Sequence, residues 1–205
     1  MFQNSTISTK TETNQPRVIC RKKVTTADYV EWAQVIYLIN ELKKEKDYSI
    51  MMVVALGSYL GLRYSDMIRL TWNDIMEKDT LVIEEQKTKK VKKLTINPDL
   101  RTIVESIHPL NKSEIIIVNK FGKPLSIQYI NRYLKKAKFK YRLKIQNISV
   151  HSFRKSFGRR VYENNHKSEH ALVLLSDLFN HSSIAITRRY LGLRQEEIAD
   201  VYLNL

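Results

Sequence analysis

The sequence contains few of the residues that build disulfides, metal clusters or membrane spans. Cys20 is the single cysteine, so an internal disulfide and a multi-cysteine zinc site are both excluded. The longest apolar runs, such as Ile115 to Val118, are much too short to cross a bilayer. No basic segment followed by an apolar one opens the chain, so no secretory signal is predicted. We therefore expect a cytoplasmic protein with no membrane partner.

Acidic residues are scarce relative to basic ones. The 205 residues include 21 Asp and Glu but 35 Lys and Arg, which gives a formal net charge of +14 at pH 7. A chain this basic is drawn to a polyanion, because neutralising phosphates releases their counterions. Nucleic acid, and double-stranded DNA in particular, is the expected partner.

Glycine and proline are also few, at five and four residues, and a hydrophobic fraction of 43% is enough for one core. Residues 1–24 are rich in Thr, Ser, Asn and Gln without an apolar period, which predicts a flexible arm. Apolar residues then recur at helical spacing, except that two short apolar runs flank the polar stretch 86–90. This pattern predicts one domain over residues 25–205, mainly α-helical with a small antiparallel β-hairpin.

Residues typical of helix ends divide the predicted helices. Thr25 followed by Asp28 resembles a helix N-terminal cap, and Gly61 is expected to end the helix over residues 50–60. Ser65 is predicted to cap the next helix, which places Arg63 at a corner between two helices.

Four separated segments carry side chains suited to cleaving a phosphodiester. In chain order they are Gly61-Leu62-Arg63-Tyr64-Ser65-Asp66, Gln86-Lys87-Thr88, His151-Ser152-Phe153-Arg154, and the stretch from His181 to Tyr190. Guanidinium groups such as those of Arg63 and Arg154 match phosphate oxygens and stay charged at any working pH. A tyrosine hydroxyl, with an ordinary pKa of about 10, becomes a nucleophile only beside a base or in a strongly positive site. His151 is the candidate base.

Tyr190 lies nine residues after His181, and positions nine apart on one helix point to opposite sides. The two side chains can meet only if the helix breaks between them. Ser182 and Ser183 are cap candidates for a new helix from Ile184, so a break is predicted there.

The order and spacing of these segments resemble the catalytic domain of the tyrosine recombinase (phage integrase) family over about residues 25–205. That family carries an Arg in a Gly-Leu-Arg corner, a hairpin Lys, a His-x-x-Arg helix start, a second His and a Tyr nine positions later. The resemblance implies the fold of that catalytic domain. It also implies site-specific DNA cleavage and rejoining through a 3′-phosphotyrosyl intermediate, as in DNA integration or recombination by a mobile element. Tyr190 would be the nucleophile, and the enzyme would self-associate, as a tetramer, on DNA.

Roles for the remaining site residues follow from the same resemblance. Lys87 resembles the general acid that protonates the leaving 5′ oxygen, and His181 resembles a further hydrogen-bond donor to the phosphate. Asp66 lies three residues after Arg63 and is expected to pair with and orient its guanidinium. The sequence has neither a Gly-x-x-x-x-Gly-Lys loop nor a clear acidic two-metal cluster, so we expect no metal, no cofactor and no ATP.

The sequence departs from the family pattern in three places. Phe179-Asn180-His181 stands where Leu-Gly-His is common, and Lys155 stands where a His often follows the second Arg. Because Asn tolerates the left-handed conformation, the corner before His181 is expected to survive. The family's N-terminal core-binding domain, which closes a clamp around DNA, is not expected within residues 1–24.

Two further surfaces are predicted to make contacts. The helix that follows Ser126 has interleaved Tyr133, Phe139 and Tyr141, and its basic residues are either a solvated face or contacts to the DNA backbone. We favour DNA contact for Arg132, Lys135, Lys136 and Lys138. At the C-terminus an apolar stripe either folds back on its own domain or, as the resemblance implies, docks on a neighbouring subunit. The stripe consists of Ile198, Val201, Tyr202 and Leu205.

Each segment also has a plainer interpretation. Tyr190 is one of eleven tyrosines, and the lysines around Lys87 serve equally well to solubilise an edge hairpin. His166 and His170 lack a third ligand at a recognisable spacing and are interpreted as solvent-facing. Two other functions stay open: a type IB topoisomerase-like relaxase, whose chemistry is closely similar, and a non-catalytic DNA-binding protein with the same fold.

Overall fold

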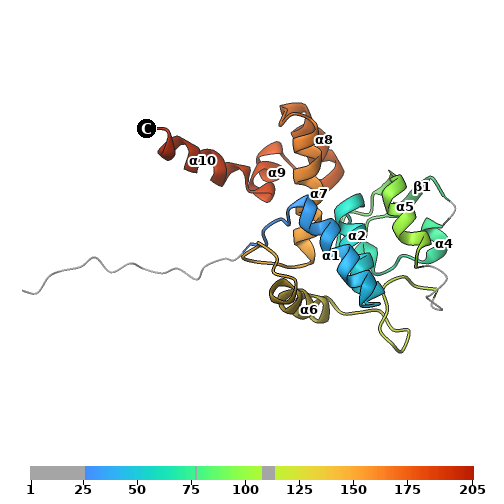
Figure 1. Cartoon of the computed structure of the whole chain (residues 1–205). Helices are drawn as coiled ribbons and strands as arrows, with labels where there is room; N and C mark the ends of the chain where they lie inside the picture. The colour runs from blue at the N-terminus through green and yellow to red at the C-terminus, as the bar shows by residue number, and fades with distance from the viewer. Residues whose placement is uncertain (1–25, 77, 108–113) are drawn as a thin grey trace, which may run out of the picture.

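The structure, a computed structural model, describes residues 26–76, 78–107 and 114–205. Within these ranges the chain is mostly helical, with one two-stranded antiparallel sheet, as predicted (Figure 1). The elements are α1 Trp32–Lys44, α2 Tyr48–Leu60, α3 Tyr64–Met67, α4 Trp72–Ile75, β1 Thr80–Glu84, β2 Val91–Thr95, α5 Pro98–Glu105, α6 Ile127–Lys140, α7 Val150–Asn164, α8 Glu169–Phe179, α9 Ile184–Leu191 and α10 Leu193–Leu203. None of the described helices is long and apolar enough to cross a membrane.

Helix α2 is the centre of the main core. It is apolar on nearly all sides, as expected of a helix enclosed by others, and it packs against α1 and α7. A Cβ at Gly57 would lie 2.8 Å from the Cβ of Phe153 in α7, so a glycine is needed for the close approach of the two helices. Helix α2 ends at Gly61, whose φ of 60° is the left-handed conformation that glycine adopts without strain.

A second, smaller core joins the C-terminal helices to α7. It contains Leu172, Leu175, Phe179, Leu191 and Leu193, with Phe157, Val161, Tyr162 and Tyr190 packed against it. A Cβ at Gly158 of α7 would lie 2.6 Å from Leu191, so α9 is held closely on α7. Gly192, at φ 81°, both ends α9 and begins α10, which points away from the rest of the domain (Figure 1).

The hairpin presents alternate residues to the protein. Leu81 pairs with Leu94 and Ile83 pairs with Lys92 across the two antiparallel strands. Leu81, Ile83 and the following Glu85 lie on the inward side of β1, and Lys92 and Leu94 lie on the inward side of β2. Two charged residues therefore continue an otherwise apolar face.

Several predicted helix ends are confirmed and two are wrong. Ser126 and Ser183 cap α6 and α9 through their side chains. Helix α1 begins at Trp32, not near Asp28, because Asp28 instead exchanges two hydrogen bonds with Asn147, each 2.9 Å long. Thr25 lies outside the described residues. The helix predicted to start at Ser65 begins at Tyr64 and has only four residues.

Candidate active site

Arg63 and Arg154 come from distant parts of the chain and meet at one backbone oxygen. Arg63 lies at the corner after α2, and its Nη2 donates to the carbonyl oxygen of Phe179 at 2.7 Å. Arg154 lies in α7, where its Nη1 donates to the Gly61 carbonyl and its Nη2 donates to the Phe179 carbonyl at 3.3 Å. Burial lowers the pKa of Arg154 to about 10, so it is still protonated at neutral pH. The fold thus holds two positive charges side by side.

A buried carboxylate offsets part of this charge. Glu85 is 1% exposed, and its Oε1 lies 2.7 Å from both Arg63 Nη1 and Lys92 Nζ. Its Oε2 accepts hydrogen bonds from the Thr88 hydroxyl at 2.6 Å and from Asn180 Nδ2 at 2.5 Å. Burial acts to raise the pKa of Glu85, but hydrogen bonds from Lys92, Thr88 and Arg63 outweigh it and lower the pKa to about 2. Glu85 is therefore ionised at neutral pH.

Asp66 contacts a different group from the one predicted. The carboxylate beside Arg63 is that of Glu85, whereas Asp66 Oδ1 accepts from the backbone N–H of Gln86 at 2.9 Å. The expected spacing argument holds for two residues on one helix, but Arg63 precedes α3 in extended conformation, with ψ 151°. Asp66, 4% exposed, therefore ties α3 to the hairpin instead of orienting the guanidinium.

The turn between α8 and α9 brings His181 beside Tyr190. Asn180 ends α8 in the left-handed conformation, with φ 51°, and Ser183 then caps α9. The ring centroids of His181 and Tyr190 are 5.4 Å apart. The predicted helix break and the convergence of these two side chains are both confirmed.

His181 is held by a buried hydroxyl on α9. Its Nδ1 lies 2.9 Å from Oγ1 of Thr187, which is fully buried. Burial, followed by the positive charges of Arg154 and Arg63, lowers the pKa of His181 to about 4. The imidazole is therefore neutral at neutral pH.

Tyr190 packs its ring in the smaller core with its hydroxyl oxygen buried. The ring centroid lies 5.5 Å from that of Phe179, and Lys155 Nζ lies 5.2 Å from the Tyr190 centroid. Burial raises the pKa of the phenol, while the charges of Arg154 and Arg63 oppose that rise. These cations act in the direction needed to stabilise a phenolate.

His151 and Lys87 lie at the edge of this cluster. His151 is in the first turn of α7 and is exposed, three residues before Arg154. Partial burial of its ring, and the charges of Arg154 and Lys155, lower the pKa of His151, which favours the neutral form that a base requires. Lys87 is exposed in the hairpin turn, and its charge contributes to the lowered pKa of His181.

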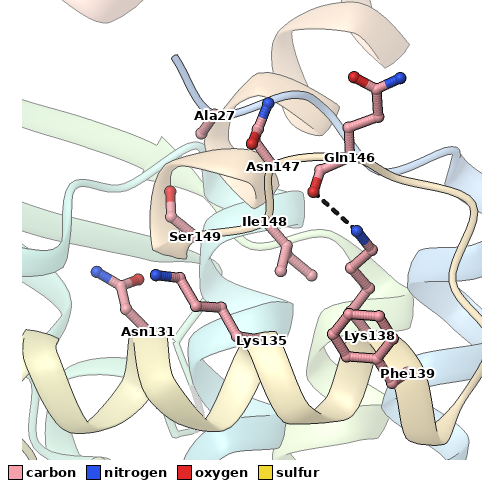
Figure 2. Close-up of a pocket in the computed structure, with 9 residues that line it drawn as sticks. All are labelled: Ala27, Asn131, Lys135, Lys138, Phe139, Gln146, Asn147, Ile148 and Ser149. Atoms are coloured by element: carbon pink, nitrogen blue, oxygen red, sulfur yellow. Dashed lines mark hydrogen bonds between the residues drawn. The ribbon is translucent and has the colours of Figure 1, made fainter. Parts of the chain in front are cut away.

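A cavity of about 430 Å³ lies between α6 and residues 146–149, which lead into α7. Figure 2 shows Lys135 and Lys138 of α6 on one side and Asn147 and Ser149 on the other. Lys135 is exposed, as are Arg132 and Lys136, whereas Lys138 is half-buried and donates to the Gln146 carbonyl at 2.8 Å. Three of the four predicted DNA contacts thus have exposed side chains.

Two of the aromatic residues predicted beside these cations, Tyr133 of α6 and Tyr141 directly after it, pack inward. The Tyr133 hydroxyl donates to Asp47, and Tyr141 is 7% exposed within the main core. Of the three aromatic residues predicted beside the cations, Phe139 is the exposed one, at 76%. Tyr133 and Tyr141 fasten α6 to the core and are poor candidates for contact with DNA.

Sequence reasoning missed Glu85, Lys92 and Thr187. The first two were detectable, because two-residue alternation from Leu81 and Leu94 puts both on the inward face of the hairpin. Thr187 had no comparable signal. Its role depends on how the turn after Asn180 directs the His181 ring.

Within the described ranges, no group of three or more His, Cys, Asp or Glu side chains is arranged to hold a metal ion. His166 is exposed between α7 and α8, and His170 is exposed in the first turn of α8, as interpreted from the sequence.

The sequence matches the model of the phage integrase family over residues 28–197. A probable integrase/recombinase of Bacillus subtilis, YoeC, is 31% identical over 81% of this chain and 87% of its own length. The tyrosine recombinase XerH of Campylobacter jejuni is 27% identical over 68% of this chain, but this match spans only 40% of XerH. The chain therefore belongs to the phage integrase family, whose members include tyrosine recombinases.

Solved structures give the same fold at low sequence identity. The XerA recombinase has a TM-score of 0.67 at 16% identity, covering 88% of this chain and 65% of its own. A lambda integrase dimer bound to a COC′ core site has a TM-score of 0.62 at 18% identity, covering 82% of this chain and 49% of its own. The predicted tyrosine recombinase catalytic-domain fold is confirmed.

Proposed function

We propose that this chain cleaves and rejoins DNA at a specific site through a 3′-phosphotyrosyl intermediate. The observation that carries the proposal is the convergence of Arg63 and Arg154 on one carbonyl, next to His181 and Tyr190. Such a cluster offers charge and hydrogen bonds to a phosphate and a nucleophile that the same charges favour. Residues 25–205 would form the catalytic domain, acting on DNA in the cytoplasm.

Each site residue then has a defined part in the reaction. The Tyr190 oxygen attacks phosphorus and displaces the 5′ oxygen, with His151 taking the phenol proton and Lys87 protonating the leaving oxygen. Arg63 and Arg154 stabilise charge on the non-bridging oxygens. Rejoining reverses the step, because a 5′ hydroxyl attacks the phosphotyrosine and releases Tyr190.

The His181–Thr187 contact supports a specific proton arrangement. If the Thr187 hydroxyl donates to Nδ1, the proton of the neutral imidazole lies on Nε2, which then donates to a non-bridging oxygen. The low pKa of His181 supports a neutral hydrogen-bond donor in this role instead of a cation.

The DNA backbone would run from this cluster across the start of α7 to α6. Exposed Arg132, Lys135 and Lys136 supply charge there, and the cavity in Figure 2 separates Lys135 from Ser149, two residues before His151. Lys138 would first have to release the Gln146 carbonyl, so we expect it to contribute less than Lys135.

We propose that α10 docks on a neighbouring subunit when a tetramer forms on DNA. Apolar side chains in its C-terminal half are exposed, including Val201 at 62% and Tyr202 at 75%. An apolar surface of this kind is stabilised by a partner. Truncation after Leu193 should leave the domain folded and DNA binding measurable but weaken multi-subunit assembly, as measured by thermal melting and sedimentation with DNA.

The decisive test traps the covalent intermediate. Nicked duplex fragments from the protein's own source genome are incubated with the chain, and adducts that survive denaturation are collected and sequenced. At a nicked site, cleavage releases a short fragment that carries the 5′ hydroxyl. Once this fragment diffuses away, rejoining cannot occur and the covalent adduct accumulates. We expect adducts at a defined sequence with the natural chain and none with Tyr190→Phe; equal recovery from both would overturn the proposal.

A further inference from the structure

Glu85 joins more parts of the active site than an ion pair with Arg63 alone would require. Its two carboxylate oxygens contact four side chains from three places in the fold: Arg63 at the α2–α3 corner, Lys92 and Thr88 in the hairpin, and Asn180 before His181. Lys92 Nζ also donates to the carbonyl of Leu178 in α8. The hairpin is thus fastened to the end of α8 through two side chains.

Burying this ionised carboxylate costs free energy unless its partners are retained. An ionised group at 1% exposure loses nearly all its hydration, and only paired charges and hydrogen bonds offset that loss. Without the negative charge of Glu85, the positive charges of Arg63, Lys92 and Arg154 would repel one another with less compensation. Their mutual repulsion would then push the hairpin away from α8.

We propose that Glu85 is a positioning residue that, with Lys92 and Asn180, latches the β1–β2 hairpin onto the corner carrying His181 and fixes the Arg63 guanidinium. The inference deepens the proposed function and rests on it for its catalytic consequence. The hairpin carries Lys87, so the latch sets where the general acid stands relative to the two arginines. Groups fixed before the substrate binds need not reorganise during the reaction.

The chain offers a matched control for the charge of Glu85. Glu84 is the preceding residue on β1, with its side chain 56% exposed beside Lys89 at 4.0 Å. Glu84→Gln and Glu85→Gln make the same chemical change one position apart, on opposite faces of the strand. Only the second removes the charge from the latch.

A second variant tests the latch without removing a buried charge. Asn180→Gly deletes the amide that donates to Glu85, and glycine adopts the left-handed conformation at φ 51° without strain. If Glu85→Gln failed to fold, the same measurements on the Asn180→Gly variant would still test the proposal.

The first measurement needs no DNA. Hydrogen exchange of the DNA-free protein reports on hairpin amides such as those of Gln86 and Lys89, which are hydrogen-bonded to Asp66 and to the Glu85 carbonyl. We expect exchange there to accelerate on the order of tenfold or more in Glu85→Gln and, less strongly, in Asn180→Gly, while amides in α2 are unchanged. Exchange equal to that of Glu84→Gln would overturn the latch.

The second measurement is single-turnover cleavage of a DNA site identified by the adduct experiment. The substrate has either an oxygen or a sulfur at the 5′ bridging position of the cleaved phosphodiester. A sulfur leaves without a proton, so a defect caused by a displaced general acid is recovered on that substrate. We expect Glu85→Gln to cleave the oxygen substrate at least about tenfold more slowly and to recover much of the loss with sulfur. Equal loss on both substrates would contradict positioning of Lys87.

The two measurements separate failure of the inference from failure of the proposed function. If the natural chain forms no adduct with DNA, the proposed function fails, and hydrogen exchange alone decides whether the latch exists. If the natural chain forms the adduct and Glu85→Gln matches Glu84→Gln in exchange and cleavage, the inference is overturned while the proposed function stands.

Discussion

The ammonium of Lys155 lies over the ring of Tyr190, with Nζ 5.2 Å from the ring centroid. Lys155 is 8% exposed, so solvent screens its charge weakly. A cation over the face of a phenol contacts the electron-rich ring directly, and it favours the phenolate over the neutral hydroxyl. Lys155, one of the residues that depart from the family pattern, thus belongs to the environment of the nucleophile.

Lys155→Met should raise the pKa of Tyr190 further. We expect cleavage near neutral pH to slow by roughly fivefold or more, the scale of a cation–π contact of about 1 kcal/mol, with the gap narrowing as the pH rises. Single-turnover cleavage between pH 6 and 10 tests this. A uniform loss at every pH would indicate a packing defect instead.

The cleavage rate should fall at acidic pH as His151 becomes protonated; this fall is the acid limb of the pH–rate profile. A general base must be unprotonated, and the pKa of His151 lies below its ordinary 6.5, so the rate should fall only as the pH drops below that value. The sign is fixed by the direction of the shift, because a lowered pKa extends the active range toward acid. His151→Gln should cleave slowly and lack this limb. A half-maximal pH above 7 in the natural chain would contradict the assignment.

Arg154→Lys should not restore what Arg154→Ala loses. Arg154 reaches both the Gly61 and Phe179 carbonyls with the two arms of one guanidinium, which a single ammonium cannot do. We expect each variant to slow cleavage by roughly 10²-fold or more, by analogy with the loss of one preorganised donor. The control is Arg160→Lys on the exposed side of α7, where the rate should be unchanged.

Nucleophile and arginines should act within one subunit. Tyr190 packs against Phe179, whose carbonyl accepts from Arg63 and Arg154, so the complete cluster forms in a single chain. A mixture of Tyr190→Phe and Arg154→Ala proteins should therefore form no more adduct than the two proteins separately. Recovery of cleavage in the mixture would mean that Tyr190 is supplied to a neighbouring active site.

Much of the site could be predicted from the sequence because its parts carry local signals. Gly61 ends a helix, Ser149 and Ser183 cap helices, and Asn180 suits a left-handed corner, so the surroundings of Arg63, Arg154 and His181 follow from neighbours in the chain. The break before Tyr190 followed from helical geometry together with the cap candidates Ser182 and Ser183.

The partners of the charged groups could not be predicted in the same way. Glu85 and Asp66 are both acidic and both near an arginine in the fold, and which of them contacts Arg63 depends on how the hairpin packs on α8. The spacing of Asp66 suggested a helical pair, but Arg63 lies just before the helix, where that geometry does not apply. The sequence also could not separate the packed Tyr133 and Tyr141 from the exposed Phe139, because tertiary contacts, such as that of Tyr133 with Asp47 between α1 and α2, decide their burial.

Gly192 has a mechanical consequence for any assembly of several chains. It is the single residue between the nucleophile helix α9 and the tail helix α10, and a Cβ there would meet no atom within 4 Å. Rotation about its two backbone torsions redirects the exposed part of α10 beyond Leu193, and the Arg188–Glu197 ion pair that spans the joint is partly exposed and weak. If several chains assemble, their contacts through α10 can therefore differ in angle while Tyr190 keeps the same position in each chain.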